Sequence, residues 1–173
     1  LMKGFIGSAN IDTNSRLCMA SSVAGHKRAF GTDTVPGTYE DLEQADLIVL
    51  VGSNLAWCHP VLYQRIAAAK EARPDMRIVN IDPRRTATTD LADLHLSIAP
   101  DGDVALFNGL LAHLAQTGRV DAAYTSAHVN GMADAVVQAQ GTDLSGTGLS
   151  APDLNAFFDL WASTDKVVTA YSQ

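Results

Sequence analysis

The most regular hydrophobic pattern in the chain is a run of five apolar residues over 47–51, followed at once by the polar turn Gly52-Ser53-Asn54. A continuous apolar run of this length is typical of a strand buried on both faces, as in a parallel sheet covered by helices. Open sheets of this kind bind ligands outside the carboxyl ends of their strands. The pattern therefore predicts a central strand over 47–51 and a ligand site at the turn after it.

Other segments complete an alternating pattern of strands and helices. Strands are expected near 77–81, 95–99 and 166–171, and helices over 16–30, 39–45, 56–72, 104–117, 121–127, 131–139 and 153–163. Such alternation favours parallel pairing, so we predict an α/β fold, a Rossmann-like three-layer domain with a mainly parallel sheet. We expect one domain over 1–173, with an extended lead-in loop over 1–15 and a flexible loop over 141–152.

Polar residues follow each of the first three predicted strands. Asp82 follows the second strand, where an acidic residue is placed to bind a ribose or a base edge. Arg84 and Arg85 can bind a phosphate, or they can form a solvated surface pair. Asp103, in the turn Asp101-Gly102-Asp103, is a candidate ligand contact and also a candidate helix N-cap. Together these turns predict a nucleotide-type site at one edge of the sheet.

Cys18 lies in the first turn of the helix expected over 16–30. Unpaired N–H groups and the helix dipole stabilise a thiolate there, which suits a nucleophile or a metal ligand. The alternative is a small buried hydrophobic residue. Cys58 and His59 are adjacent, which is poor geometry for a metal pair on a helix. Four other aromatic or imidazole side chains are interpreted as core residues: Trp57, His113, His128 and Trp161.

Composition excludes several classes of protein. The net charge of −7 and the lack of a Lys/Arg cluster argue against a nucleic-acid surface. No apolar run approaches the roughly 18 residues that span a bilayer, so no membrane partner is expected. The two cysteines form no CxxC or zinc pattern, which indicates a reducing, cytoplasmic setting. A start without Met and an end on a strand lead us to expect a piece of a longer chain.

Several stretches of the chain share a joint pattern with one enzyme family. They are Asn10-Ile11-Asp12-Thr13-Asn14-Ser15-Arg16-Leu17-Cys18-Met19-Ala20-Ser21, Asp41-Leu42-Glu43-Gln44-Ala45-Asp46, Val51-Gly52-Ser53-Asn54-Leu55-Ala56-Trp57-Cys58-His59-Pro60, Asn80-Ile81-Asp82-Pro83-Arg84 and Pro100-Asp101-Gly102-Asp103. Together they resemble the central part of the catalytic subunit of molybdenum nitrate reductases, in the molybdopterin oxidoreductase (DMSO reductase) family. The resemblance is to the assimilatory and periplasmic enzymes. It is close over residues 1 to about 110 and loose beyond.

The resemblance implies a role for each matching residue around a molybdenum bis-molybdopterin guanine dinucleotide (Mo-bis-MGD). Cys18 would supply the thiolate ligand to molybdenum, and Asn14 would lie beside the pterin. Gly52, Ser53 and Asn54 would line the phosphate site, with Trp57 and Cys58 at the entrance of the next helix. The guanosine end would be held by Ile81, Asp82 and Arg84, and completed by Asp101, Gly102 and Asp103.

The resemblance also implies an activity, the reduction of nitrate to nitrite in nitrate assimilation. Electrons would come from a donor protein or domain through a 4Fe–4S cluster, held by a cysteine-rich N-terminal segment that this chain lacks. The remaining domains of the same chain would complete the cofactor site, so this chain is expected to be inactive alone. One alternative is a formate dehydrogenase or another oxyanion reductase of the same family. Another is a non-catalytic nucleotide-binding module, which the lack of Gly-x-Gly-x-x-Gly after Val51 disfavours.

Overall fold

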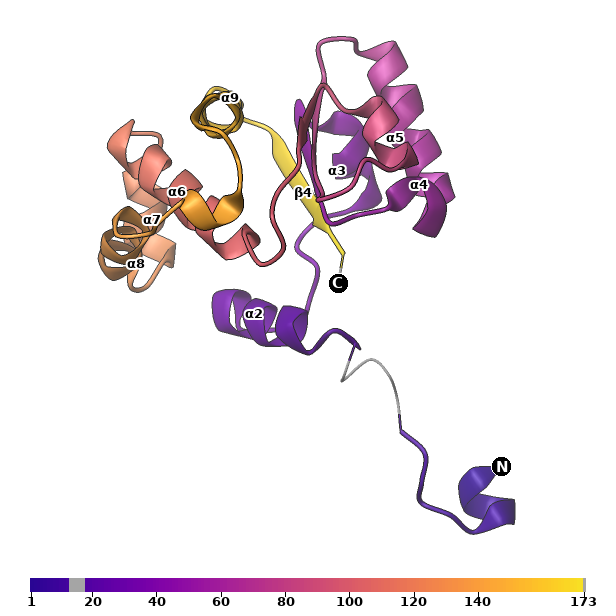
Figure 1. Cartoon of the computed structure of the whole chain (residues 1–173). Coiled ribbons are helices and arrows are strands. Elements are labelled where there is room, and N and C mark those ends of the chain that lie inside the picture. The colour runs from indigo at the N-terminus through magenta and orange to yellow at the C-terminus, as the bar shows by residue number, and fades with distance from the viewer. Residues whose placement is uncertain (13–17, 173) are drawn as a thin grey trace. The chain divides into compact units, whose positions relative to one another are not determined.

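The computed structural model describes residues 1–12 and 18–172 (Figure 1). Whereas the sequence predicts one domain over 1–173, the described residues form two compact units, Leu1–Thr38 and Tyr39–Ser172. The first unit contains a single helical turn, η1 (Met2–Ile6), and the helix α2 (Ala20–Phe30). No residue of η1 or α2 is buried. The lead-in predicted as extended is therefore helical over Met2–Ile6, and the helix predicted over 16–30 is confirmed from Ala20 onward.

The second unit is built on a four-stranded, all-parallel sheet. Its strands are β1 (Leu47–Val51), β2 (Arg77–Ile81), β3 (Leu94–Leu96) and β4 (Val167–Tyr171), in the spatial order β3-β2-β1-β4. This arrangement confirms the predicted Rossmann-like α/β fold. The third strand is shorter than the predicted 95–99. The Ile98 N–H donates to the Leu96 carbonyl and the Ala99 N–H to the Thr147 carbonyl, so the chain leaves the sheet after Leu96.

Helices cover both faces of this sheet (Figure 1). On one face lie α3 (Tyr39–Gln44), α4 (Leu55–Cys58) and α5 (Pro60–Ala72). The other side carries α6 (Asp103–Gln116), α7 (Ala122–His128), α8 (Met132–Gln140), the turn η3 (Ser145–Thr147) and α9 (Ala151–Ala162). The loop predicted over 141–152 therefore contains η3, and its last two residues belong to α9.

The side chains of β1 alternate between two separate hydrophobic clusters. Leu47, Val49 and Val51 pack with residues of α6 and α9 such as Leu106 and Phe157. Ile48 and Leu50 pack with Leu42 of α3 and Ile66 of α5. Every β1 residue is buried, as the apolar run predicted, because a strand between two helical layers has no face toward water.

The helix predicted over 56–72 is interrupted at its ligand end. His59 ends α4 by donating its N–H to the Leu55 carbonyl, and Pro60 begins α5. Proline has no N–H to donate to a preceding turn, and its fixed φ suits the first position of a helix. The prediction that Pro60 falls in a first turn is thus confirmed for α5, while the single continuous helix was wrong.

The edge of the sheet away from the carboxyl ends of the strands is held by Asp93, the residue before β3. Its Oδ2 accepts hydrogen bonds from Lys70 Nζ and from the Ile78 N–H, both at 2.7 Å, and its Oδ1 lies 3.4 Å from Arg77 Nη1. Burial alone would raise the pKa of Asp93, but these bonds and the charges of Lys70 and Arg77 outweigh burial and lower it. Asp93 thus links α5, β2 and β3 as a carboxylate.

Replacing Asp93 by Asn should lower the free energy of unfolding by about 1–2 kcal/mol at neutral pH, because hydrogen bonds to a charged group are lost. The folded pKa lies below the unfolded value, so the carboxylate stabilises the fold above about pH 4 and this contribution disappears as pH falls through the folded pKa. Urea unfolding at pH 7 and pH 3 measures the loss of unfolding free energy and its dependence on pH. Asp75→Asn, at an exposed position, is the matched control and should change little; an Asp93→Asn effect that is equal at both pH values would contradict the assignment.

Candidate functional site

The strand order places a switch point between β1 and β4. The chain runs from β1 outward to β2 and β3, and then returns to pair β4 on the other side of β1. At such a reversal the loops that leave neighbouring strands diverge, and a crevice opens outside the carboxyl ends of the strands. The three predicted polar turns all belong to this edge because the strands are parallel.

Gly52 forms the exit from β1 at the switch point. Its φ of 58° lies in the left-handed region, and its N–H donates to the Ile81 carbonyl of β2 at 2.8 Å. On the β4 side, the Ser172 N–H donates to the Val51 carbonyl at 3.0 Å. A Cβ added to Gly52 would meet only the Ser172 carbonyl oxygen, at 3.8 Å, so it is the backbone conformation that favours glycine here. Ser53 is buried directly after it.

Asn54 begins the short helix α4. Its carbonyl accepts hydrogen bonds from the N–H groups of Trp57 and Cys58, at 3.1 and 2.9 Å. The interpretation of Trp57 as a core residue was wrong: the residue is 77% exposed and belongs to neither hydrophobic cluster. Cys58 is an exposed free thiol in the same turn. Trp57 and Cys58 therefore lie at the helix entrance, open to a ligand.

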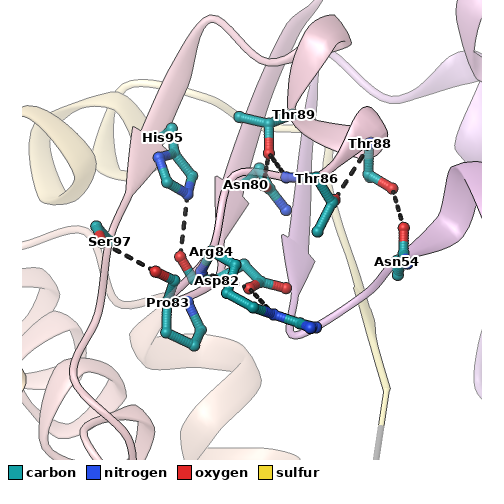
Figure 2. A network of polar contacts seen from close by, with 10 residues as sticks. All are labelled: Asn54, Asn80, Asp82, Pro83, Arg84, Thr86, Thr88, Thr89, His95 and Ser97. Carbon is teal, nitrogen blue, oxygen red and sulfur yellow. Dashed lines mark hydrogen bonds and ion pairs between the residues drawn. The ribbon is translucent and has the colours of Figure 1, made fainter.

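Asp82 is the buried carboxylate at the end of β2 (Figure 2). Its Oδ1 accepts from the Arg84 N–H at 2.8 Å, which closes a tight turn around Pro83. Its own N–H donates to the Leu96 carbonyl, and its carbonyl lies 3.0 Å from His95 Nε2. Since a carbonyl can only accept, His95 carries its proton on Nε2. Asp82 is thus fixed from β2, from β3 and from its own loop, while Ile81 before it is buried.

The Arg84 side chain contributes little to that fixation. Its Nε lies 3.9 Å from Asp82 Oδ1, and the side chain is 76% exposed. An ion pair this exposed adds about 1 kcal/mol at most, so the guanidinium is largely available for a ligand.

The third turn is tightly packed. Asp101 has a φ of 66°, in the left-handed region, and Gly102 precedes α6. A Cβ on Gly102 would lie 3.0 Å from the Ala99 carbonyl oxygen, the Ile98 side chain and the Thr147 Cα. The prediction of Asp103 as the N-cap was wrong, because Gly102 holds that position and Asp103 is the first residue of the helix. The half-buried Asp103 side chain makes no capping hydrogen bond.

A polar network beneath the first two turns was not predicted from the sequence (Figure 2). Thr89 Oγ1 of the short helix η2 (Ala87–Leu91) donates to Asn80 Oδ1 of β2 at 2.7 Å, and Thr88 Oγ1 donates to Asn54 Oδ1 at 3.4 Å. Asn80 is 0% exposed, and its Nδ2 has no partner among the described residues. An amide among the apolar residues Ile78, Val79 and Ile81, with three threonines in four positions over 86–89, was the available signal.

The energy balance of this network does not favour it as a source of stability. A buried donor without a partner costs about 1–3 kcal/mol, whereas one neutral hydrogen bond returns about 0.5–1.5 kcal/mol. The bond between Thr89 and Asn80 therefore offsets only part of the cost of the unpartnered Asn80 Nδ2 group. What the network provides is a fixed geometry between β2, η2 and the turn after β1.

Cys18 lies in the first unit and is an exposed free thiol, so the alternative of a buried hydrophobic residue was wrong. Asn14 lies outside the described residues. No group of three or more His, Cys, Asp or Glu residues that could hold a metal occurs within 1–12 and 18–172.

Two hollows in the second unit lie away from the three turns. One, of about 410 Å³, lies beyond the end of α6 and before β4, and is lined by residues such as Arg119, Trp161 and Asp165. The other, of about 350 Å³, lies beside the break between α4 and α5 and includes Tyr39 and Arg65. Neither contains a residue of the three turns. No helix of the described segments is long and apolar enough to span a bilayer.

One family model and two curated relatives match nearly the whole chain. A family model described as molybdopterin oxidoreductase matches residues 1–156. A nitrate reductase of Shewanella frigidimarina is 54% identical over 177 residues, covering 99% of this chain and 19% of its own length. A nitrate reductase of Klebsiella oxytoca is 51% identical over 176 residues, covering 99% of this chain and 20% of its own length. The chain thus spans about a fifth of the length of the curated relatives it matches.

A solved structure supports the fold independently. Acetylene hydratase from Pelobacter acetylenicus superposes with a TM-score of 0.77 over 96% of this chain and 23% of its own. At 20% sequence identity this likeness concerns the fold alone.

The close packing of Gly102 yields a test of how the third turn is built. Gly102→Ala should lower the free energy of unfolding by about 1–3 kcal/mol, because two of the three atoms at 3.0 Å from the new methyl group belong to the backbone and cannot rotate away. Gly146→Ala is the matched control, since an added Cβ there meets nothing within 4 Å, and it should stay within about 0.5 kcal/mol of the wild type. Equal urea midpoints for the two variants would contradict this packing.

Proposed function

The chain belongs to the molybdopterin oxidoreductase family, and from this premise we propose that it is part of the catalytic subunit of an assimilatory-type nitrate reductase. The parent enzyme reduces nitrate to nitrite at a Mo-bis-MGD centre. The observation that carries this proposal is identity above 50% to two nitrate reductases across nearly the whole chain. The names of these relatives favour nitrate over formate or another oxyanion as the substrate.

The activity belongs to the whole protein, because this chain spans about a fifth of its relatives. We propose that the rest of the protein completes the cofactor site and holds a 4Fe–4S cluster, which passes electrons from a donor protein or domain. On this view the isolated chain is inactive and the parent is cytoplasmic.

The described residues of the second unit fit the dinucleotide part of such a cofactor. Gly52 has no Cβ and allows a diphosphate to approach closely at the switch point. Its own N–H is bonded to Ile81, and Asn54 adds amide donors next to it. Asp82 presents a buried carboxylate, which is suited to accept hydrogen bonds from the N–H groups of guanine. Arg84 offers an exposed cation for phosphate, and the turn over 101–103 completes the guanosine end.

Cys18 fits the metal end because it is a free and exposed thiol. As a thiolate it would be the protein ligand to molybdenum and would tune its reduction potential. When bound, the cofactor would supply the two electrons with which nitrate and two protons give nitrite and water. This chain's residues bind and orient the cofactor while the metal carries the chemistry.

A nucleotide-binding module without catalysis is the alternative of another class. It would bind a dinucleotide at the same switch point, but the chain has Gly52 alone where a nicotinamide-type phosphate loop has three spaced glycines. Metal content separates the two proposals, since a non-catalytic module would contain no molybdenum.

We expect the full-length protein from a molybdate-replete host to contain one molybdenum and two pterins per chain and to reduce nitrate. Cys18→Ala should lower nitrate reduction by at least about 10³-fold, the order of loss seen when a group central to catalysis is removed, because the metal loses its protein ligand. Pterin and guanine nucleotide should remain bound, since the second unit still holds the dinucleotide. Elemental analysis, pterin fluorescence and initial rates measure these quantities.

Met19→Leu is the control for this experiment, because it removes the neighbouring sulfur and leaves the Cys18 thiol in place. Its activity should match the wild type. Full turnover in Cys18→Ala with molybdenum still bound would refute the ligand role. A wild-type protein that lacks both molybdenum and pterin would leave the nucleotide-binding module as the better proposal.

A further inference from the structure

The helix η2 lies directly behind the turn that follows β1 (Figure 2). Thr88, in the middle of η2, is completely buried. Its hydroxyl accepts a hydrogen bond from the Ala56 N–H at 3.0 Å and donates one to Asn54 Oδ1 at 3.4 Å. A single buried hydroxyl thus contacts both the backbone and a side chain of the segment that carries the proposed phosphate site.

The rest of η2 is held firmly, so the Thr88 hydroxyl has a fixed position. Thr86 caps the helix by accepting from the Thr88 N–H at 3.3 Å, and the Thr86 N–H donates to Thr89 Oγ1 at 3.1 Å. Thr89 in turn donates to Asn80 in β2. From the other side, the Tyr63 hydroxyl of α5 donates to the Ala87 carbonyl at 3.2 Å.

The bond from Thr88 decides which end of the Asn54 amide faces a ligand. A side-chain amide has an acceptor oxygen and a donor nitrogen that occupy similar volumes, so packing alone does not distinguish them. Thr88 Oγ1 accepts from the Ala56 N–H and donates to Asn54 Oδ1, so the oxygen end of the amide is the end that faces Thr88. Among the described residues Asn54 Nδ2 makes no hydrogen bond, so its two N–H groups remain available at the switch point.

We propose that Thr88 is a positioning residue for the phosphate end of the cofactor, acting through Asn54. It holds the Asn54 amide so that N–H donors, and not the carbonyl oxygen, face the oxygens of a diphosphate. This inference rests on the proposed function, because it assumes a guanine dinucleotide at this edge of the sheet. It also explains why the chain keeps a polar network with an unpartnered buried amide: the bonds of Asn80, Thr86 and Thr89 fix the position of Thr88.

The test uses the full-length protein loaded with cofactor and measures how fast guanine dinucleotide is lost during dialysis, by pterin fluorescence and released GMP. Thr88→Val has the shape of threonine without the hydroxyl and should lose the cofactor about ten-fold faster, a change worth about 1.4 kcal/mol. Thr88→Ser restores the hydroxyl and should return the rate toward the wild type. Thr164→Val is the matched control: it removes a hydroxyl that donates to the Leu160 carbonyl in α9, and it should leave the rate unchanged.

Two further variants separate positioning from a general effect on the fold. In an Asn54→Ala background, Thr88→Val should cause no additional loss, because the residue through which it acts is gone. Asn54→Asp leaves Thr88 intact and still accepts its hydrogen bond, but offers no donor to phosphate. It should lose the cofactor at least as fast as Thr88→Val, and it tests the inference even when Thr88→Val does not fold.

Each possible result bears on a definite claim. Equal loss rates for a loaded wild type and Thr88→Val, or for wild type and Asn54→Asp, would overturn the inference and leave the proposed function intact. Additive effects of Thr88→Val and Asn54→Ala would overturn the route through Asn54. A wild-type protein without guanine dinucleotide would overturn the proposed function and this inference with it.

Discussion

The architecture of the second unit depends on the burial of β1 on both faces and along both edges. The side chains on its two faces pack into separate hydrophobic clusters, and its two edges pair with β2 and β4. A strand enclosed in this way uses its own backbone groups in the ladders and leaves no side chain for water or ligand. Polar groups can therefore face a ligand only after β1 ends, and the chain leaves the strand at Gly52. The position of the candidate site follows from the burial of the strand.

At the other two turns of this edge, backbone constraints also fix the positions of the residues, but the residues differ in chemistry. Asp82 keeps a carboxylate buried by accepting from the Arg84 N–H of its own loop, while its backbone N–H donates to the Leu96 carbonyl of β3. Gly102 allows the third turn to lie against Ala99 and Thr147. In each case a backbone constraint positions the polar atom, so the geometry is set before any ligand arrives. This preorganisation lowers the entropy that binding would otherwise have to overcome.

Local patterns allowed much of this fold to be predicted, and distant contacts explain where prediction failed. β1 was predicted with its observed bounds because a continuous apolar run specifies a buried strand, and β2 was predicted with its observed bounds although it contains Arg77 and Asn80. β3 was predicted too long because its end depends on a hydrogen bond from Ala99 to Thr147, far along the chain. Trp57 was misassigned because α4 has only four residues, too few for a hydrophobic period to indicate which side of the helix faces the core. The threonines over 86–89 indicated a polar network, but the partners of Thr88 could not be predicted because Asn54 and Ala56 precede it by more than thirty residues.

The switch point also has a consequence for the order of folding. Leu47 pairs with Arg77 on one side but with Val167 on the other, so the two edges of β1 differ greatly in the chain length that must be closed. Closing the shorter loop costs less entropy, which favours early pairing of β1 with β2 and late docking of β4. Pulse-labelled hydrogen exchange during refolding would detect this as earlier protection of β2 than of β4, and simultaneous protection would contradict it. The crevice would then be complete only after β4 has docked, and a cofactor could bind there only after that step.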